Sequence, residues 1–210
     1  MKSLNVRIMA LVFLAVVFAA PAGEAAAQSQ GFYLGVFGGY AVPDDMRISV
    51  RGASVDAGTD NTGILGVKFG WVPPQAKFLA LEMEFGHIFE HSYSYATARG
   101  SESGDVYLNN VMFNLLFRYP DGGIHPYIGA GIGWSYFNAE ATGYDAYGPY
   151  YASEDDYAFA WQFLAGVDFQ IANNISLDLG YRYFGTDPDL SIADIEYRAN
   201  IFTVGLNFRF

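Results

Sequence analysis

The stretch Thr203-Val-Gly-Leu-Asn-Phe-Arg-Phe210 alternates apolar and polar residues up to its final aromatic. Successive side chains of a β-strand point to opposite faces, so Val204, Leu206, Phe208 and Phe210 share one face. A wholly apolar face on a terminal strand favours a lipid environment. The alternative is an ordinary amphipathic edge strand of a soluble domain.

Earlier segments of the chain alternate in the same way, with one apolar face and one polar, small or glycine face. Together with the terminal stretch they give eight segments: 32–40, 62–71, 77–93, 106–119, 127–137, 157–171, 175–184 and 195–210. Strands of about nine residues or more have the length that a tilted membrane strand needs. The pattern predicts an all-β fold, an eight-stranded antiparallel up-and-down transmembrane β-barrel.

The connections between these segments alternate in length. Short connections are expected at 72–76, 120–125 and 172–174, and long loops at 41–61, 94–105, 138–156 and 185–194. Outer-membrane barrels have short periplasmic turns and longer outer loops. Because the number of strands is even and the short turns lie on the periplasmic side, both ends of the barrel are expected on that side.

The amino terminus has the pattern of a cleavable signal peptide over residues 1–27. Lys2 and Arg7 precede an apolar run over residues 8–20, and Ala25-Ala26-Ala27 offers a small-residue cleavage site. The remaining residues, 28–210, form a single barrel domain on this interpretation, and a retained membrane anchor is the alternative. The chain has no cysteine, so disulfides contribute nothing to its stability.

The acidic charge of the chain bears on its partners. The formal net charge is −11, and residues 1–27 contribute only two basic residues and one acidic residue. An acidic chain repels nucleic acid, so a nucleic-acid-binding function is disfavoured. The expected partners are outer-membrane lipid and lipopolysaccharide, the barrel-insertion machinery during assembly, and an unidentified extracellular ligand reached through the long loops.

The chain resembles small outer-membrane β-barrel proteins related to the transmembrane domain of outer membrane protein A. The resemblance spans residues 28–210 and rests on Gly31-Phe-Tyr-Leu-Gly-Val-Phe-Gly-Gly-Tyr40, Pro126-Tyr-Ile-Gly-Ala-Gly-Ile-Gly133, Leu177-Asp-Leu-Gly-Tyr-Arg-Tyr183 and the closing strand. It implies location in the bacterial outer membrane. It also implies that Thr203, Gly205, Phe208 and Phe210 form the signal recognised by the insertion machinery.

Inward alternation places four basic and four acidic residues inside the barrel. They are Lys68, Arg118, Arg182, Arg209, Glu82, Glu84, Asp168 and Asp178. An eight-stranded barrel is filled by its own side chains, and buried charges are paired. We therefore expect an ion-pair network that plugs the lumen, with Arg118 pairing to Glu82 or Glu84. A gate that passes water or small ions is the alternative.

The sequence indicates no enzyme, no cofactor and no metal site. His91 lies near the outer rim, but the adjacent residues Glu90 and Ser92 point to the opposite face of the strand. His125 falls at the periplasmic end and His87 on the lipid face. The acidic loops lack the spacing of a calcium-binding loop. The expected function is structural, with surface presentation of the loops; a narrow low-conductance channel and a surface adhesin remain alternatives.

Overall fold

The computed structural model describes residues 31–50, 53–97, 100–145, 148–189 and 194–210. The predicted signal peptide, residues 1–27, lies outside the described residues. Among the residues described, no helix is long and apolar enough to cross a membrane. The strands are β1 (Gly31–Pro43), β2 (Met46–Val50), β3 (Ala53–Thr59), β4 (Thr62–Val72), β5 (Leu79–Thr97), β6 (Gly100–Arg118), β7 (Ile124–Asp145), β8 (Gly148–Gln170), β9 (Ile175–Thr186) and β10 (Asp194–Arg209).

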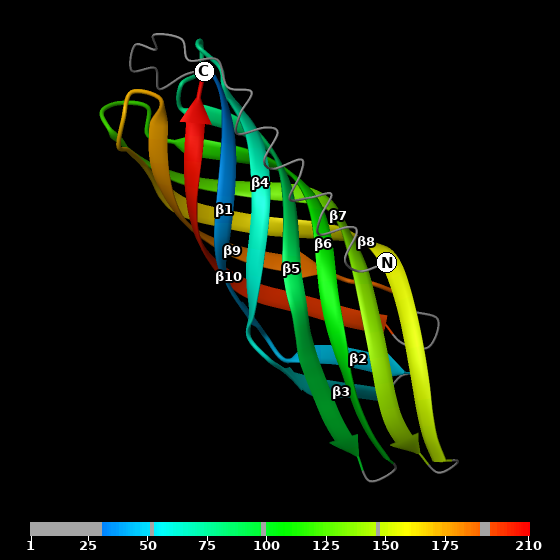
Figure 1. Ribbon diagram of the computed structural model, residues 1–210. Helices are drawn as coiled ribbons and strands as arrows, with labels where there is room; N and C mark the ends of the chain where they lie inside the picture. The colour runs from blue at the N-terminus through cyan, green and yellow to red at the C-terminus, as the bar shows by residue number, and fades with distance from the viewer. Residues whose placement is uncertain (1–30, 51–52, 98–99, 146–147, 190–193) are drawn as a thin grey trace.

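Eight of these strands close into a barrel, as Figure 1 shows. Each pairs antiparallel with its neighbour in the order β1, β4, β5, β6, β7, β8, β9 and β10, and β10 returns to β1 from Tyr33 opposite Arg209 to Pro43 opposite Ala199. In a closed barrel the backbone N–H and C=O groups of each strand bond to both neighbouring strands. This is required in a membrane because its hydrocarbon core offers these groups no water. The predicted eight-stranded antiparallel barrel is confirmed.

The three short connections lie at one end of the barrel, as expected. They are residues 73–78, 119–123 and 171–174. The second carries Gly122 at a φ of +77°, a left-handed conformation that glycine adopts without steric cost. The tight turn between β6 and β7 depends on this residue.

At the opposite end the expectation of long loops was largely wrong. Residues 41–61 contain the hairpin β2–β3, and the stretches 94–105 and 138–156 are mostly strand in β5, β6, β7 and β8. The hairpin fills the space between β10 and β5: Glu196 lies opposite Arg47, and Thr59 lies opposite Tyr93. Outside lipid a strand needs no apolar outer face. The prediction ended the strands too early because it required an apolar outer face along their whole length.

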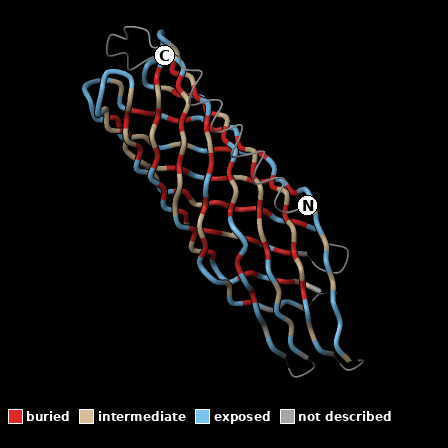
Figure 2. Tube along the Cα trace, in the orientation of Figure 1, coloured by how far each residue is buried: buried red, intermediate tan, exposed pale blue. Residues whose placement is uncertain are grey.

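The two faces of the barrel wall differ as the alternation predicted, and Figure 2 shows buried and exposed positions alternating along the strands. The outward apolar residues include Phe69, Phe85, Phe113, Ile132, Phe163 and Val204, each at least 42% exposed. Above them a row of aromatic rings crosses β5 to β8. His87 contacts Tyr107, Tyr107 contacts Tyr136 and Tyr136 contacts Tyr157, with centroids 6.1, 6.4 and 4.9 Å apart. Such rings mark the interface between lipid and water.

Glycine on the inner wall makes room for large aromatic neighbours. The Tyr33 ring covers Gly70, and the Phe37 ring covers Gly66. A side chain at either glycine would overlap the ring, because a Cβ built at each position falls within contact distance of it. These rings pack directly against the backbone of the neighbouring strand on the lumen side.

Candidate functional site: the filled barrel interior

All eight charged residues expected in the lumen point inward and are buried. None of them is more than 9% exposed, and most lie in the half of the barrel nearer the short turns. They come from β4, β5, β6, β8, β9 and β10, so the barrel wall brings together residues from distant parts of the chain.

Lys68 is the centre of the largest group. Its ammonium forms an ion pair with Asp178 and lies 3.3 Å from the Glu82 carboxylate. The Tyr33 hydroxyl donates to Glu82 at 2.5 Å, and the Tyr127 hydroxyl donates to Asp178 at 2.8 Å. Both carboxylates therefore have a charged partner and a neutral donor, as buried charges require.

A second ion pair lies between the charged part of the lumen, near the short turns, and the apolar part further out. Arg182 donates to Glu84, and its guanidinium carbon lies 4.6 Å from the centroid of the Phe37 ring. This is the geometry of a cation–π contact. Arg182 therefore joins the charged network to the apolar residues above it.

The third group surrounds Asp168 near the short turns. Arg209 reaches one carboxylate oxygen at 2.5 Å, and Ser176 and Asn207 donate to the other at 2.7 Å each. His125 lies opposite Asp168 on β7 and is fully buried, with Nδ1 2.9 Å from the Tyr119 carbonyl oxygen. Three groups thus hold the Asp168 carboxylate, and His125 joins the start of β7 to the short connection before it.

Arg118 lies on β6, next to the strand β5 that carries its expected partners Glu82 and Glu84. Glu82 and Glu84 form ion pairs with Lys68 and Arg182. Arg118 lines the same small cavity as Glu82, Asp168 and Arg209. The direct pairing of Arg118 with Glu82 or Glu84 stays a prediction.

Sequence reasoning missed the neutral polar members of this interior. Tyr33, Tyr127, Ser176 and Asn207 complete the charged groups, and Gln162 donates to Asn114 at 2.8 Å. The alternation places these side chains on the inner face of their strands. The prediction considered only charged residues and therefore did not include them.

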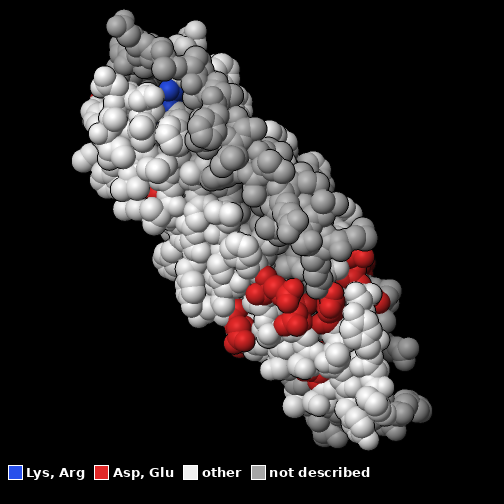
Figure 3. All heavy atoms as spheres, viewed as in Figure 1, with Lys and Arg blue, Asp and Glu red and all other residues white. Residues whose placement is uncertain are grey.

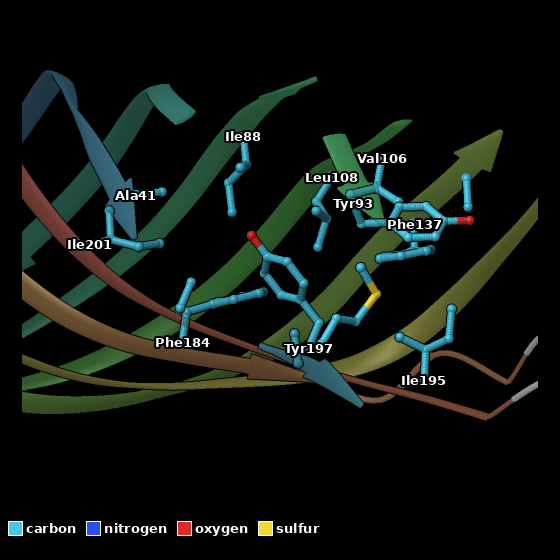
Figure 4. Packing of buried hydrophobic residues seen from close by; sticks show 14 of the residues in the cluster. Ala41, Ile88, Tyr93, Val106, Leu108, Phe137, Phe184, Ile195, Tyr197 and Ile201 are labelled. Atoms are coloured by element: carbon cyan, nitrogen blue, oxygen red, sulfur yellow. The ribbon is translucent and has the colours of Figure 1, made fainter. Parts of the chain in front are cut away.

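The outer half of the lumen is lined mostly by apolar residues, which the sequence did not indicate. Figure 4 shows side chains from opposite walls meeting there, with the Tyr197 ring near Phe184 and Phe137. The Phe137 and Phe184 rings lie 6.4 and 6.3 Å from the Tyr197 ring. The buried cluster also includes Met46, Ile48, Ile64, Ile88, Val106, Leu108, Met112, Ile195 and Ile201. The β2–β3 hairpin supplies two of these residues and so helps to close this end.

Little free space remains beside the charged groups. The cavity among them has a volume of about 20 Å³ and is lined by Lys68, Arg118, Asp168 and Asp178, among others. That volume holds about one water molecule.

His91 lies inside the outer half of the barrel, above the aromatic row. It is 4% exposed, its Nδ1 is 3.1 Å from the Phe89 carbonyl oxygen, and its ring lies 5.8 Å from the Tyr197 ring. Ser92 and Glu90 are exposed on the outer face. The three residues do not form a common pocket, and His87 lies on the outer face at Asn109.

We predict that His91 makes the stability of the barrel depend on pH. Burial lowers the pKa of His91, although Asp60 and Asp105 act in the opposite direction. The unfolded chain, with an ordinary histidine pKa of about 6.5, then binds the proton more tightly than the folded barrel. The free energy of unfolding should fall as the pH drops from about 7 towards 5.

Urea unfolding at several pH values tests this prediction, with His91→Gln as the comparison. In the His91→Gln variant, the free energy of unfolding should change less between pH 5 and 7 than in the unsubstituted barrel. His87→Gln, on the outer face, is the matched control and should keep the slope. Equal slopes in all three proteins would contradict the assignment to His91.

Acidic side chains gather on the outside of the outer half. Figure 3 shows them in one band in that view. Asp105 on β6 lies opposite Glu140 on β7, and Asn138 on β7 lies opposite Asp155 on β8. Within the described residues, no group of three or more His, Cys, Asp or Glu is arranged to hold a metal ion.

The residues of the expected assembly signal lie on β10, which closes the barrel, and at Phe210 directly after it. Thr203 and Gly205 point inward, opposite Gly39 and Phe37 of β1. Phe208 and Phe210 point outward, and Phe210 N donates to the Phe32 carbonyl oxygen at 3.0 Å. Their recognition by the insertion machinery stays a prediction.

Comparison with known proteins identifies the fold. The sequence profile described as "Outer membrane protein beta-barrel domain" matches residues 11–210. The comparison with curated proteins gives no match.

Three solved barrels show the structural likeness. Neisserial surface protein A is 17% identical with a TM-score of 0.53, covering 86% of this chain and 97% of its own. The outer membrane protein OprG from Pseudomonas aeruginosa is 16% identical with a TM-score of 0.52, covering 90% and 98%. The outer membrane protease OmpT from Escherichia coli is 11% identical with a TM-score of 0.51, covering 86% and 97%.

These identities are low, so the three structures show a shared fold. The profile match extends over nearly the whole chain and agrees with the closed barrel and its apolar outer band. The chain therefore belongs to the outer membrane protein β-barrel domain family and is located in the bacterial outer membrane.

Proposed function

We propose that this protein is a plugged, non-enzymatic barrel that contributes to the structure of the outer membrane and carries a rigid β-extension at the cell surface. The observation that supports the proposal is the presence of two layers of buried side chains in the lumen. Ion pairs occupy the half nearer the short turns, and an apolar cluster occupies the outer half. An ion would have to break both layers to cross.

The extension supports the surface part of this proposal. β5, β6, β7 and β8 have 19, 19, 22 and 23 residues, about twice the length needed to cross a membrane. Their outer parts are paired strands rather than loops, so they hold a fixed shape above the lipid. We propose that this surface faces extracellular partners.

We predict that the barrel does not conduct ions in a planar bilayer. The variant Glu84→Ala/Arg182→Ala removes the pair at the boundary but leaves the apolar cluster, so it should also be silent. The variant Phe137→Ala/Tyr197→Ala thins only the apolar layer and should likewise be silent. Combining all four substitutions leaves the Lys68 and Asp168 groups in place, so this variant should be silent as well. A porin with an open lumen, recorded in the same bilayer, shows that the assay detects current.

The alternative function, a gated narrow channel, gives a different result. Reproducible openings of the unsubstituted barrel would overturn the plugged lumen. Openings after removal of the Glu84 and Arg182 side chains alone would identify that pair as the gate. A shift in mobility between heated and unheated gel samples confirms that each variant is folded before its current is recorded.

A further inference from the structure

The outer part of β8 has a neighbour on one side only. β8 pairs with β7 from Gly148 opposite Asp145 onwards, but its pairing with β9 begins at Ala160 opposite Thr186. Within the described part of the chain, the edge from Gly148 to Phe159 therefore has no ladder partner on the β9 side. Figure 1 shows β8 extending past the ends of β9 and β10.

The connection from β9 to β10 is too short to cover this edge. The edge has twelve residues, a length of about 40 Å at the rise of a strand. The connection has seven residues, 187–193, which span at most about 25 Å when fully extended. It must also return to β10, whose outer end pairs with β2.

The described contacts of this connection with β8 occur at the inner end of the edge. Thr186 Oγ1 donates to the Phe159 carbonyl oxygen at 3.0 Å, and Asp189 N donates to the Asp156 carboxylate at 2.9 Å. Towards Gly148, the described residues give β8 no ladder partner on the side away from β7. Such an edge accepts a further strand, as in β-strand addition.

The charge of the edge selects the kind of strand it accepts. Glu154, Asp155 and Asp156 follow one another on it, and residues 119–181 contain no lysine or arginine. A second copy of this chain would place these acidic runs against each other, and like charges opposite one another destabilise a sheet. A basic strand would place opposite charges across the new ladder.

Exposed aromatic rings lie beside the acidic run. Tyr151 and Tyr157 are 65% and 73% exposed on the outer side of β8. Lysine and arginine side chains pack their apolar stems and charged heads against such rings. Rings and carboxylates therefore favour the same class of partner.

We propose that the Gly148–Phe159 edge of β8 binds an extended segment rich in lysine or arginine from another protein, as an added β-strand. This proposal rests on the surface part of the proposed function and is independent of whether the lumen conducts. The bound segment would form main-chain hydrogen bonds with β8 and, on the outer face that also carries Tyr151 and Tyr157, an ion pair with Asp155.

The test uses the refolded barrel in detergent micelles and two peptides of equal length and charge. One alternates lysine with threonine, and the other alternates lysine with proline. The proline peptide lacks an N–H donor at every second residue and cannot form a regular ladder. Fluorescence anisotropy measures affinity, and hydrogen exchange measures protection of the β8 amides.

We expect the lysine–threonine peptide to bind and to slow exchange within residues 148–159, and the proline peptide to give no such protection. The variant Asp155→Asn should weaken binding by roughly threefold, through the loss of one cross-strand charge pair. Asp45→Asn makes the same change in charge away from β8 and should bind as the unsubstituted barrel does.

Three results would overturn the proposal: no protection of the edge, equal binding of both peptides, or equal loss of affinity in the two variants. The last two would indicate a general attraction between an acidic surface and a cation. None of these results depends on conductance. A barrel that neither conducts ions nor binds the lysine–threonine peptide therefore contradicts the strand-addition proposal but not the proposed plug.

Discussion

Replacing Lys68 with methionine should lower the free energy of unfolding by about 3–5 kcal/mol, the usual cost of removing one partner from a buried ion pair. Lys68 neutralises both Asp178 and Glu82, so its loss removes a cation that two buried carboxylates share. Methionine retains most of the side-chain volume, so the effect reports charge rather than a cavity. Urea titration in detergent micelles, followed by tryptophan fluorescence, measures the change.

Two further variants make the Lys68 result specific. Lys77→Met removes an exposed lysine in the connection between β4 and β5 and should change stability little. The triple variant Lys68→Met/Glu82→Gln/Asp178→Asn removes the charges together and should recover part of the loss. A midpoint for Lys68→Met equal to that of the unsubstituted barrel would show that Lys68 does not stabilise this network.

Deleting Phe210 should remove most of the folded barrel from the outer membrane of cells that express it. We expect this because Phe210 is the final outward aromatic of the proposed assembly signal and is 57% exposed to the lipid side. Its backbone N–H also holds the end of β10 to Phe32. Membrane fractionation, with heated and unheated gel samples, measures how much folded protein reaches the membrane.

Refolding in detergent separates recognition from stability. The protein lacking Phe210 should refold in micelles nearly as well as the full chain if the residue acts as a signal. Ile171→Ala is a matched control, because Ile171 is 60% exposed beside a short turn and lies outside β10. If the deleted protein reaches the membrane as well as the full chain, Phe210 is not part of the signal.

The inner and outer faces of the strands were predictable because period-two alternation assigns each side chain to one face. Lys68, Glu82 and Arg182 were placed in the lumen on this basis, and each is buried in the structure. The closing strand was also predictable, since the apolar face of β10 is complete over 204–210. The outer extents of β5 to β8 were not, because their outward residues there are serine, tyrosine and acids rather than lipid-facing apolar residues.

The sequence by itself determined the all-β class, the eight membrane strands and the face on which each charge lies, because these depend on local periodicity. Only the tertiary structure decided that Lys68 meets Asp178, a residue 110 positions away, and that Arg182 meets Glu84. Such pairs form across the lumen, so they depend on strand tilt and stagger, which alternation does not encode. The apolar outer cluster, and the β8 edge that has no ladder partner among the described residues, were likewise set by where neighbouring strands end.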